Sequence, residues 1–581
     1  MNNISDKKQP VDGFKNMPVC AVDALGRRMP EPGISSTERE NSTVGLFYFL
    51  WLCCHNKKLY NISEITDADP EAGYKTDDPK WGGIGDMHYW GEPFYGYYSM
   101  DDEWVIRRHM KLIMQAEIDF LYFDTTNAVV YEPVCHRVMK VLQEYALQGF
   151  KIPKVMFYTN TRSGWTVQKI YEEFYKPGLY RETWFELDGK PVIIAIPGEC
   201  SDEVREFFNI KLSQWPNEPT KQGGWPWMDF EKPQRVFENL QGEPESINVS
   251  VAQHPQIRFG DSVMYGETTN CGRAWHDGDN DKGKNAWIKG LNLAEQFERA
   301  LETHPPIVLV TGWNEWIAGR WQGPPERPIM FVDCANYEFS RDIEMMRDGY
   351  FDNYFMQLIS YVRKYKGTRG VAPSPCGEKT VYEGFTDGAF TRDCLGWIDE
   401  IRFENSTMRT SIKRVTVSHT EKDLKFEIEA SEIPERSGAF FNVFISTGER
   451  AGYDFILNYA PEGAPVKEGE ALVARIVRPD PYSVEMRDVP VERPCDRLDR
   501  SVFVIGENSL EIGENTVTVT VPLTVLGLGP DVNPEGKTDE FWFKVADSTE
   551  PYKVIDDFYD KGDVLPMGRA GFVYRMDYKQ P

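Results

Sequence analysis

The spacing of apolar residues changes once along this chain of 581 residues, and that change constrains the fold more than any other feature. Before residue 367, short apolar runs alternate with segments in which apolar residues recur at helical spacing. After residue 380, apolar and polar residues alternate with a period of two, as in strands with one buried face. The Pro/Gly-rich stretch between them is typical of a domain boundary. We therefore expect an N-terminal extension (1–40), a barrel domain (41–368), a linker (369–380) and a β-sandwich domain (381–581).

The first region contains eight candidate strands separated by helical segments. They are Val44–Leu52, Asp119–Phe123, Lys154–Tyr158, Pro191–Ile196, Phe207–Leu212, Gly224–Met228, Ile247–Ala252 and Ile307–Thr311. The clearest helix is Asp102–Ile118, which follows a capping-box pattern at Ser99 and Asp102. Eight strands alternating with helices predict an α/β fold of the (β/α)8 TIM-barrel type, although little helix is visible around the fifth and sixth strands.

The second region contains short strands at regular intervals, which predict a C-terminal antiparallel β-sandwich. They are Ile412–His419, Leu424–Glu429, Phe440–Ser446, Tyr453–Asn458, Ala471–Val477, Thr516–Val521 and Phe541–Val545.

Charge and composition exclude several classes of partner. Lys and Arg number 65 and Asp and Glu 91, so the net charge of −26 disfavours nucleic acid and anionic membranes. The longest apolar run, Val44–Cys54, is about half of the ~20 residues that a membrane helix needs. Because no secretion signal is visible, we expect a cytoplasmic protein, or an exported one whose signal was trimmed. The ten cysteines show no CxxC spacing and are expected to be mostly buried thiols, and no cofactor is indicated.

The last predicted barrel strand leads into Trp313, Asn314, Glu315 and Trp316, with Arg320 close behind. Active sites of such barrels lie at the carboxyl ends of the strands. A carboxylate beside indole rings and an amide suits sugar chemistry, because indoles stack on sugar rings and amides bind hydroxyls. Glu315 is thus a candidate catalytic residue. The alternative is a tryptophan-rich core in which Glu315 pairs with Arg320.

Other polar residues follow the remaining strands, and a glycosidase needs a second carboxylate. Asp124, after the second strand, is the favoured partner of Glu315, although it could also cap a loop. Further candidates for substrate binding lie at other strand ends and in loops: Trp90, Glu92, Tyr95, Glu199, His254, Arg273 and His276. For these residues, a polar rim or loop packing remains open.

A loop between the seventh and eighth strands imitates a calcium site. Asp277, Asp279 and Asp281 alternate, but glycine occupies the seventh position and Ile288 the twelfth, which excludes an EF-hand. We therefore assign no metal site.

Two stretches point to a family. Gly96–Asp124 (GYYSMDDEWVIRRHMKLIMQAEIDFLYFD) and Thr311–Trp316 (TGWNEW) resemble the glycoside hydrolase family 99-like barrels, related to endo-α-mannosidases and family 71 glucanases. The resemblance implies a (β/α)8 barrel, a carbohydrate substrate and a site centred on Glu315. The endo-mannosidase branch has a second glutamate three positions after the first, and here that position is Ala318. The second carboxylate is therefore sought among Asp124, Glu92 and Glu199.

The C-terminal region resembles carbohydrate-binding module family 9-like sandwiches. The matching stretches are Tyr453–Asn458, Phe541–Asp547 and Gly562–Arg569. The two resemblances together imply a glycoside hydrolase that acts on an oligo- or polysaccharide. Two alternatives remain: a non-catalytic glycan-binding protein on a decayed barrel, and a metal-dependent hydrolase or lyase that uses Asp277–Asp281. The oligomeric state stays open.

Overall fold

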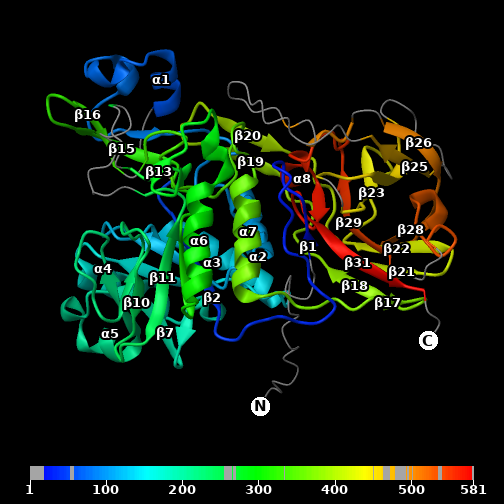
Figure 1. Cartoon of the computed structure of the whole chain (residues 1–581), viewed down its shortest axis with the longest axis horizontal. Coiled ribbons are helices and arrows are strands. Elements are labelled where there is room, and N and C mark those ends of the chain that lie inside the picture. Colours follow the sequence, from blue (N-terminus) through cyan, green and yellow to red (C-terminus); the bar gives the residue numbers. More distant parts are fainter. Residues whose placement is uncertain are drawn as a thin grey trace.

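The computed structural model describes residues 19–52, 58–253, 265, 270–332, 334–448, 451–461, 471–477, 493, 496–499, 502–533 and 539–578. Its first region is built on parallel strands, and its second region on antiparallel sheets (Figure 1). In the part of the chain that is described, no helix combines the length and apolar character that a membrane span requires. Seven cysteines in these ranges are free thiols, and four of them are buried.

Eight parallel strands form the sheet of the first region, and each matches a predicted strand to within a few residues. They are β2 (Thr43–Tyr48), β4 (Phe120–Thr125), β5 (Lys154–Thr159), β7 (Lys190–Ala195), β8 (Asn209–Gln214), β9 (Gly224–Pro226), β11 (Pro244–Ser250) and β14 (Ile307–Thr311). β14 pairs with β11 and β2, and pairing then follows chain order to β9. The antiparallel strand β10 (Val236–Glu238) and β11 both lie against β9. The sheet is therefore barrel-like and nearly closed.

Helices cover this sheet unevenly. They are α2 (Glu103–Gln115), α3 (Glu132–Leu147), α4 (Ser163–Ile170), α5 (Asp202–Phe207), α6 (Leu291–Thr303) and α7 (Asn353–Lys366). In the fully described stretch 209–250, no α-helix separates β8 from β9 or β9 from β11. Prolines 216, 219, 226 and 233 interrupt this stretch, and proline breaks helices because it lacks an N–H and clashes with the preceding turn.

Aromatic side chains fill the interior of the sheet. The rings of Phe47 and Tyr122 stack with centroids 4.7 Å apart, and Phe120 stacks on Phe185 at 4.2 Å. Gly45 makes this packing possible, because a Cβ there would lie 2.3 Å from the Phe120 ring. These rings therefore form a packed core inside the sheet.

Two large antiparallel sheets and a two-stranded one, β19 (Arg392–Leu395) with β20 (Arg402–Asn405), form the second region, and every predicted strand is present. The larger sheet contains β1 (Val19–Cys20), β31 (Gly571–Asp577), β29 (Asp539–Ser548), β23 (Ala439–Ser446), β24 (Phe455–Tyr459), β25 (Leu472–Ile476) and β26 (Val502–Glu507), in that order. The smaller sheet contains β18 (Thr380–Glu383), β21 (Ile412–His419), β22 (Asp423–Ala430), β28 (Thr516–Pro522) and β27 (Ser509–Ile512). The sheets pack through aromatic contacts such as Phe426 with Phe543.

The two regions are joined by more than their linker. The N-terminal strand β1 pairs antiparallel with β31, so part of the expected extension belongs to the C-terminal sheet (Figure 1). Within the expected linker, β17 (Ser374–Pro375) also pairs with β31. Helices α2 and α7 lie on the side of the barrel that faces these sheets (Figure 1). Buried ion pairs cross the junction, from Arg392 to Asp102 and from Arg569 to Asp352.

Candidate active site

Two strands of the barrel-like sheet bring carboxylates to one cavity. Asp124 lies near the end of β4, and Glu315 follows the end of β14. Both residues line a cavity of about 370 Å³. Asp124 is 8% exposed and Glu315 is 2% exposed, so the two carboxylates are largely shielded from bulk water. The two residues that the sequence predicts as a catalytic pair thus share one cavity.

Four tryptophans also line this cavity: Trp51, Trp215, Trp227 and Trp321. The first three follow the carboxyl ends of β2, β8 and β9, which is where a barrel presents its functional side chains. Trp51 stacks on Phe49 at 5.9 Å, and Trp215 lies 5.5 Å from Trp227. Trp321 is 51% exposed, so much of its ring faces outward. Such indole surfaces beside a few polar groups are typical of sugar sites.

A buried arginine holds Glu315. Arg341 Nε donates to Glu315 Oε2 at 2.9 Å, and Arg341 Nη2 donates to Oε1 at 3.0 Å. Arg341 is fully buried, and its guanidinium lies 5.2 Å from the ring of Trp227. Two parallel charge-assisted hydrogen bonds fix both the plane and the charge of a carboxylate. The alternative pairing of Glu315 with Arg320 is not what the structure shows.

Asp124 is held in part by its own loop. Its Oδ1 accepts hydrogen bonds from the backbone N–H of Thr126 at 3.0 Å and from the Thr126 hydroxyl at 2.7 Å. Thr126 and Asn127 also line the cavity. Hydrogen bonds from Thr126 thus help to orient Asp124, and the ion pair with Arg341 orients Glu315.

Asn314 connects two loops of the site. Its Oδ1 accepts from the Phe49 N–H at 2.9 Å, and its Nδ2 donates to the Phe49 carbonyl at 3.0 Å. Trp313 N–H donates to the Phe47 carbonyl at 2.9 Å. The segment after β14 is therefore fixed to the segment after β2, which positions Glu315. Asn314 does not line the cavity. Its side chain binds the Phe49 backbone, whereas the sequence predicts contact with sugar hydroxyls.

Three tryptophans predicted to stack on substrate pack against protein instead. Trp90 and Trp316 stack on each other with centroids 4.6 Å apart and an interplanar angle of 13°. Trp316 Nε1 donates to Glu344 at 2.5 Å, and Trp313 packs against Phe355. All three tryptophans are fully buried. A ring that stacks on a sugar must leave at least one face uncovered. These three tryptophans therefore belong to the core next to Glu315 and lie outside the lining of the cavity.

A buried polar segment, 340–344, supports this core. Trp90 Nε1 donates to Asp342 Oδ2 at 2.8 Å, and burial raises the pKa of Asp342 to about 8, partly opposed by Arg273. Glu344 accepts from Tyr98 and His109, each at 2.9 Å. Glu344 thus has donors from several elements, as a buried carboxylate requires, whereas the raised pKa of Asp342 favours its protonated form near neutral pH.

Three further candidates for substrate binding are also engaged elsewhere. Arg320 donates to backbone carbonyls, including that of Thr76 at 2.7 Å. Arg273 is fully buried, donates to the Asp342 carbonyl at 2.9 Å and lies 4.4 Å from the Tyr354 ring. Tyr95 is buried and donates to the Tyr559 carbonyl at 3.3 Å. These residues brace the fold and lie outside the lining of the cavity.

The two remaining candidate carboxylates lie outside the lining as well. Glu92 pairs with Arg347 at 2.8 Å, and burial raises its pKa while Arg347 lowers it. Glu199 is exposed and accepts from the Gly164 N–H at 3.1 Å. Ala318, the position of the second glutamate in the endo-mannosidase branch, is buried in β15 (Ile317–Gln322) opposite His88. Asp124 is thus the candidate partner that shares the cavity with Glu315.

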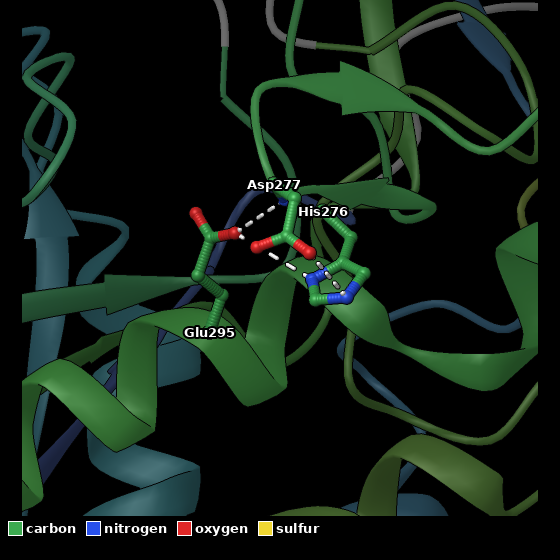
Figure 2. A group of neighbouring side chains, drawn as sticks. All are labelled: His276, Asp277 and Glu295. Atoms are coloured by element: carbon green, nitrogen blue, oxygen red, sulfur yellow. Dashed lines mark hydrogen bonds and ion pairs between the residues drawn. The ribbon is translucent and has the colours of Figure 1, made fainter.

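The acidic loop between β11 and β14 brings together three side chains of types that can bind a metal ion. His276 and Asp277 of this loop lie beside Glu295 of α6 (Figure 2). His276 turns Nε2 toward Asp277 at 3.1 Å and Nδ1 toward Glu295 at 3.8 Å, so different ring nitrogens face the two carboxylates. Asp281 pairs with Lys289 at 3.3 Å. The group lies outside the lining of the cavity. His254 lies outside the described residues.

Sequence reasoning missed Trp51, Trp215, Trp227 and Arg341. The three tryptophans carry a usable signal, because each lies near or just after the carboxyl end of a strand that the sequence predicts. Arg341 carries none: it lies 26 residues after Glu315, in a segment without helix or strand.

No protein-family model matches the chain, and no curated protein matches it. Among solved structures, it is similar to a GH99 endo-α-mannosidase from Bacteroides thetaiotaomicron, with 13% identity, a TM-score of 0.35 and coverage of 55% of this chain and 97% of that one. A complex of that enzyme with bis-tris-propane gives 15% identity, a TM-score of 0.32 and coverage of 56% and 97%. A glycoside hydrolase-like protein gives 13% identity, a TM-score of 0.31 and coverage of 59% of this chain and 97% of that one. Because these TM-scores lie below 0.5, we base the functional conclusion on the cavity itself.

Proposed function

We propose that this protein hydrolyses a glycosidic bond of an oligo- or polysaccharide in the cavity lined by Asp124 and Glu315. One observation carries the proposal: two carboxylates from different strand ends line a single cavity whose other walls are largely tryptophan and phenylalanine. Glycosidases of most families use such a carboxylate pair around the scissile bond. The tryptophans would bind the faces of the sugar rings.

The reaction needs the two carboxyl groups in different protonation states. One group, as the acid, gives its proton to the leaving oxygen as the C–O bond to the anomeric carbon breaks. The other group, as the carboxylate, either takes a proton from the attacking water or first forms a glycosyl ester that water then hydrolyses. The oxygen of water ends on the anomeric carbon in both cases. The chain thus needs no cofactor for this chemistry.

The lining of the cavity favours uncharged sugars. Among the described residues that line it, the charged ones are the two acids Asp124 and Glu315. A uronate or sulfate group would meet like charge from these two acids, and the described lining residues include no Lys or Arg to pair with it. We therefore propose a neutral glycan as the substrate class.

The test compares wild type with Glu315→Gln and Asp124→Asn on a panel of neutral α- and β-linked glycans. General acid–base catalysis contributes about 10²- to 10⁴-fold, so each variant should lose activity on that scale. Glu199→Gln is the matched control, because Glu199 also follows a barrel strand but lies outside the cavity lining. It should retain wild-type activity, and EDTA should change nothing.

Two other outcomes would replace the proposal. Sugar-induced thermal stabilisation without turnover would indicate a glycan-binding protein, a reading that Ala318 favours. Loss of activity with EDTA, restored by a divalent cation, would indicate metal-dependent chemistry.

A further inference from the structure

We propose that Asp342 is a positioning residue: as an uncharged acid it fixes, together with Trp90, the main chain of Glu315. Ionisation of Asp342 at alkaline pH then loosens Glu315 and lowers the activity of the site. The effect on activity rests on the proposed hydrolysis, whereas the contacts among these three residues stand independently of it.

One indole N–H joins Asp342 to the backbone of Glu315. Trp90 Nε1 donates to Asp342 Oδ2 at 2.8 Å and to the Glu315 carbonyl at 3.1 Å. The Trp90 ring also stacks on Trp316, the residue after Glu315, with centroids 4.6 Å apart. The backbone N–H of Glu315 in turn donates a hydrogen bond to the Asp342 carboxyl. Both main-chain polar groups of Glu315 are therefore tied to Trp90 and Asp342.

Asp342 is held in place by the main chain around it. The Glu344 N–H donates to the Trp313 carbonyl at 3.0 Å, so the segment that carries Asp342 runs along the loop that carries Glu315. Arg273 Nη2 donates to the Asp342 carbonyl at 2.9 Å. Asp342 is fully buried, so its carboxyl reaches water only if the segment moves.

Burial keeps the Asp342 carboxyl uncharged near neutral pH. It raises the pKa of Asp342 to about 8; Arg273 is the largest opposing influence, and Glu344 adds to the rise. A closed segment therefore binds this proton more tightly than an opened one, and a pH above about 8 favours opening. Charged or titratable groups reach this cluster from several elements: Arg273, Arg341, Glu344, Tyr350, Tyr354 of α7 and His109 of α2.

The first test needs no activity and measures amide hydrogen exchange of residues 312–317 by mass spectrometry, with all proteins compared at the same pH. Asp342→Asn keeps the shape of the side chain and an acceptor for Trp90, but it cannot ionise. It should match wild type at pH 7, whereas above pH 8 wild type should exchange faster, by up to about tenfold per pH unit. Asp342→Leu removes the acceptor and should exchange faster than both at pH 7. Equal exchange in all three proteins would overturn the proposal.

The second test measures kcat/KM on a glycan that wild type cleaves. The ratio of Asp342→Asn to wild type should be close to one at pH 7 and rise by up to about tenfold per pH unit above pH 8, because only wild type loses its uncharged acid there. The other titrating groups of the reaction are shared by both proteins and cancel in this ratio. A ratio that stays constant up to pH 10 would refute the positioning role.

Asp560→Asn is the matched control. Asp560 ends α8 (Asp557–Asp560) and lies outside the lining of the cavity, and burial raises its pKa to about 7. This variant should follow wild type in both tests. If it instead changes exchange at 312–317 and kcat/KM as Asp342→Asn does, the effect is a general response to alkaline pH and the proposal fails.

Trp90→Phe tests the link itself, because it removes the indole N–H and keeps an aromatic ring. Small displacements of a reacting group can cost about 10²-fold, so Trp90→Phe and Asp342→Leu should each lower kcat by up to that factor while KM changes little. The double variant should lose little more than either single variant. Fully additive losses would show that Asp342 does not act through Trp90.

The two proposals fail separately. If wild type cleaves no glycan but exchanges faster than Asp342→Asn above pH 8, the proposed hydrolysis fails and the positioning stands. If wild type cleaves a glycan but the kcat/KM ratio and the exchange show no dependence on Asp342, the positioning fails and the hydrolysis stands.

Discussion

A tryptophan can bind a sugar ring only where one of its faces is left uncovered, and this condition separates two groups of tryptophans around Glu315. Trp316 lies next to Glu315 in sequence but is fully buried beneath it. Trp321, five positions further, is half-exposed at the rim of the cavity. Proximity in sequence therefore does not identify the residue that meets the substrate.

We expect Trp321→Ala to weaken substrate binding. A stacked aromatic pair contributes about 0.5–1.5 kcal/mol, so KM should rise about 2- to 10-fold while kcat changes little. Trp165→Ala is the matched control, because Trp165 is 45% exposed on α4 and lies outside the lining. Steady-state kinetics on the same glycan would decide. An equal rise in KM for both variants would remove Trp321 from the site.

At this scale the sequence predicts Asp124 and Glu315 because each follows an apolar strand, and strand ends meet at one face of a barrel. The same rule applies to Trp51, Trp215 and Trp227, although the weak pattern of the fifth and sixth strands obscures the last two. Arg341 is different in kind. Its pairing with Glu315 depends on how the segment 340–344 folds back onto the loop after β14, which no local spacing encodes.

Among the elements, α2 shows how a helix can be predicted while its environment is not. Asp102 is its N-cap, since its Oδ1 accepts from the Val105 N–H at 3.4 Å, whereas the predicted capping box of Ser99 and Asp102 would place the cap at Ser99. The helix ends at Gln115, three residues before the predicted end, and Glu117 then takes a left-handed conformation with φ of 57°. The other oxygen of Asp102 accepts from Arg392 Nε at 2.7 Å, a partner 290 positions away. The cap joins residues three positions apart and can be predicted from local sequence, whereas the ion pair joins distant residues and cannot.

We expect Asp102→Ala to destabilise the protein more than the loss of a cap explains. Ser201→Ala at the N-terminus of α5 removes a cap and an exposed hydrogen bond to Gln168 but no ion pair, and loss of a cap costs about 0.5–2 kcal/mol. Asp102→Ala also leaves the buried Arg392 unpaired, and breaking a buried ion pair costs about 3–5 kcal/mol. Guanidinium unfolding curves of the two variants would show the difference. Equal losses would mean that the Arg392 contact contributes nothing.

The sequence predicts an extension, a barrel, a linker and a sandwich one after another, but in the structure segments of the extension and the linker pair with the C-terminal sheet. Local patterns predict a change in apolar spacing at 367–380, but they contain no information about which distant strands pair. The structure places β1, from the N-terminal extension, on the edge of the C-terminal sheet. It also buries Arg108 of α2 against the Tyr559 carbonyl at 3.2 Å. The antiparallel region is therefore packed onto the barrel that carries the cavity.

Arg569 is the clearest link at this junction. It pairs with Asp352, which precedes α7, at 2.8 and 3.0 Å, and also with Asp496, and all three side chains are buried. Arg569→Met should therefore remove the arginine that pairs with the buried Asp352 and one of the two arginines that pair with Asp496, and cost at least the ~3–5 kcal/mol of one broken buried pair.

Because those carboxylates belong to both regions, calorimetry should show wild type unfolding in one transition and Arg569→Met unfolding at a lower temperature in both regions together. Arg402→Met removes an arginine whose ion pairs are exposed, and such pairs contribute about 0–1 kcal/mol, so its transition should stay close to that of wild type. Two separate transitions in wild type would show that the barrel folds without the antiparallel sheets. A single transition that Arg569→Met lowers would show that the C-terminal sheets form part of the support of the barrel, whether or not they bind sugar themselves.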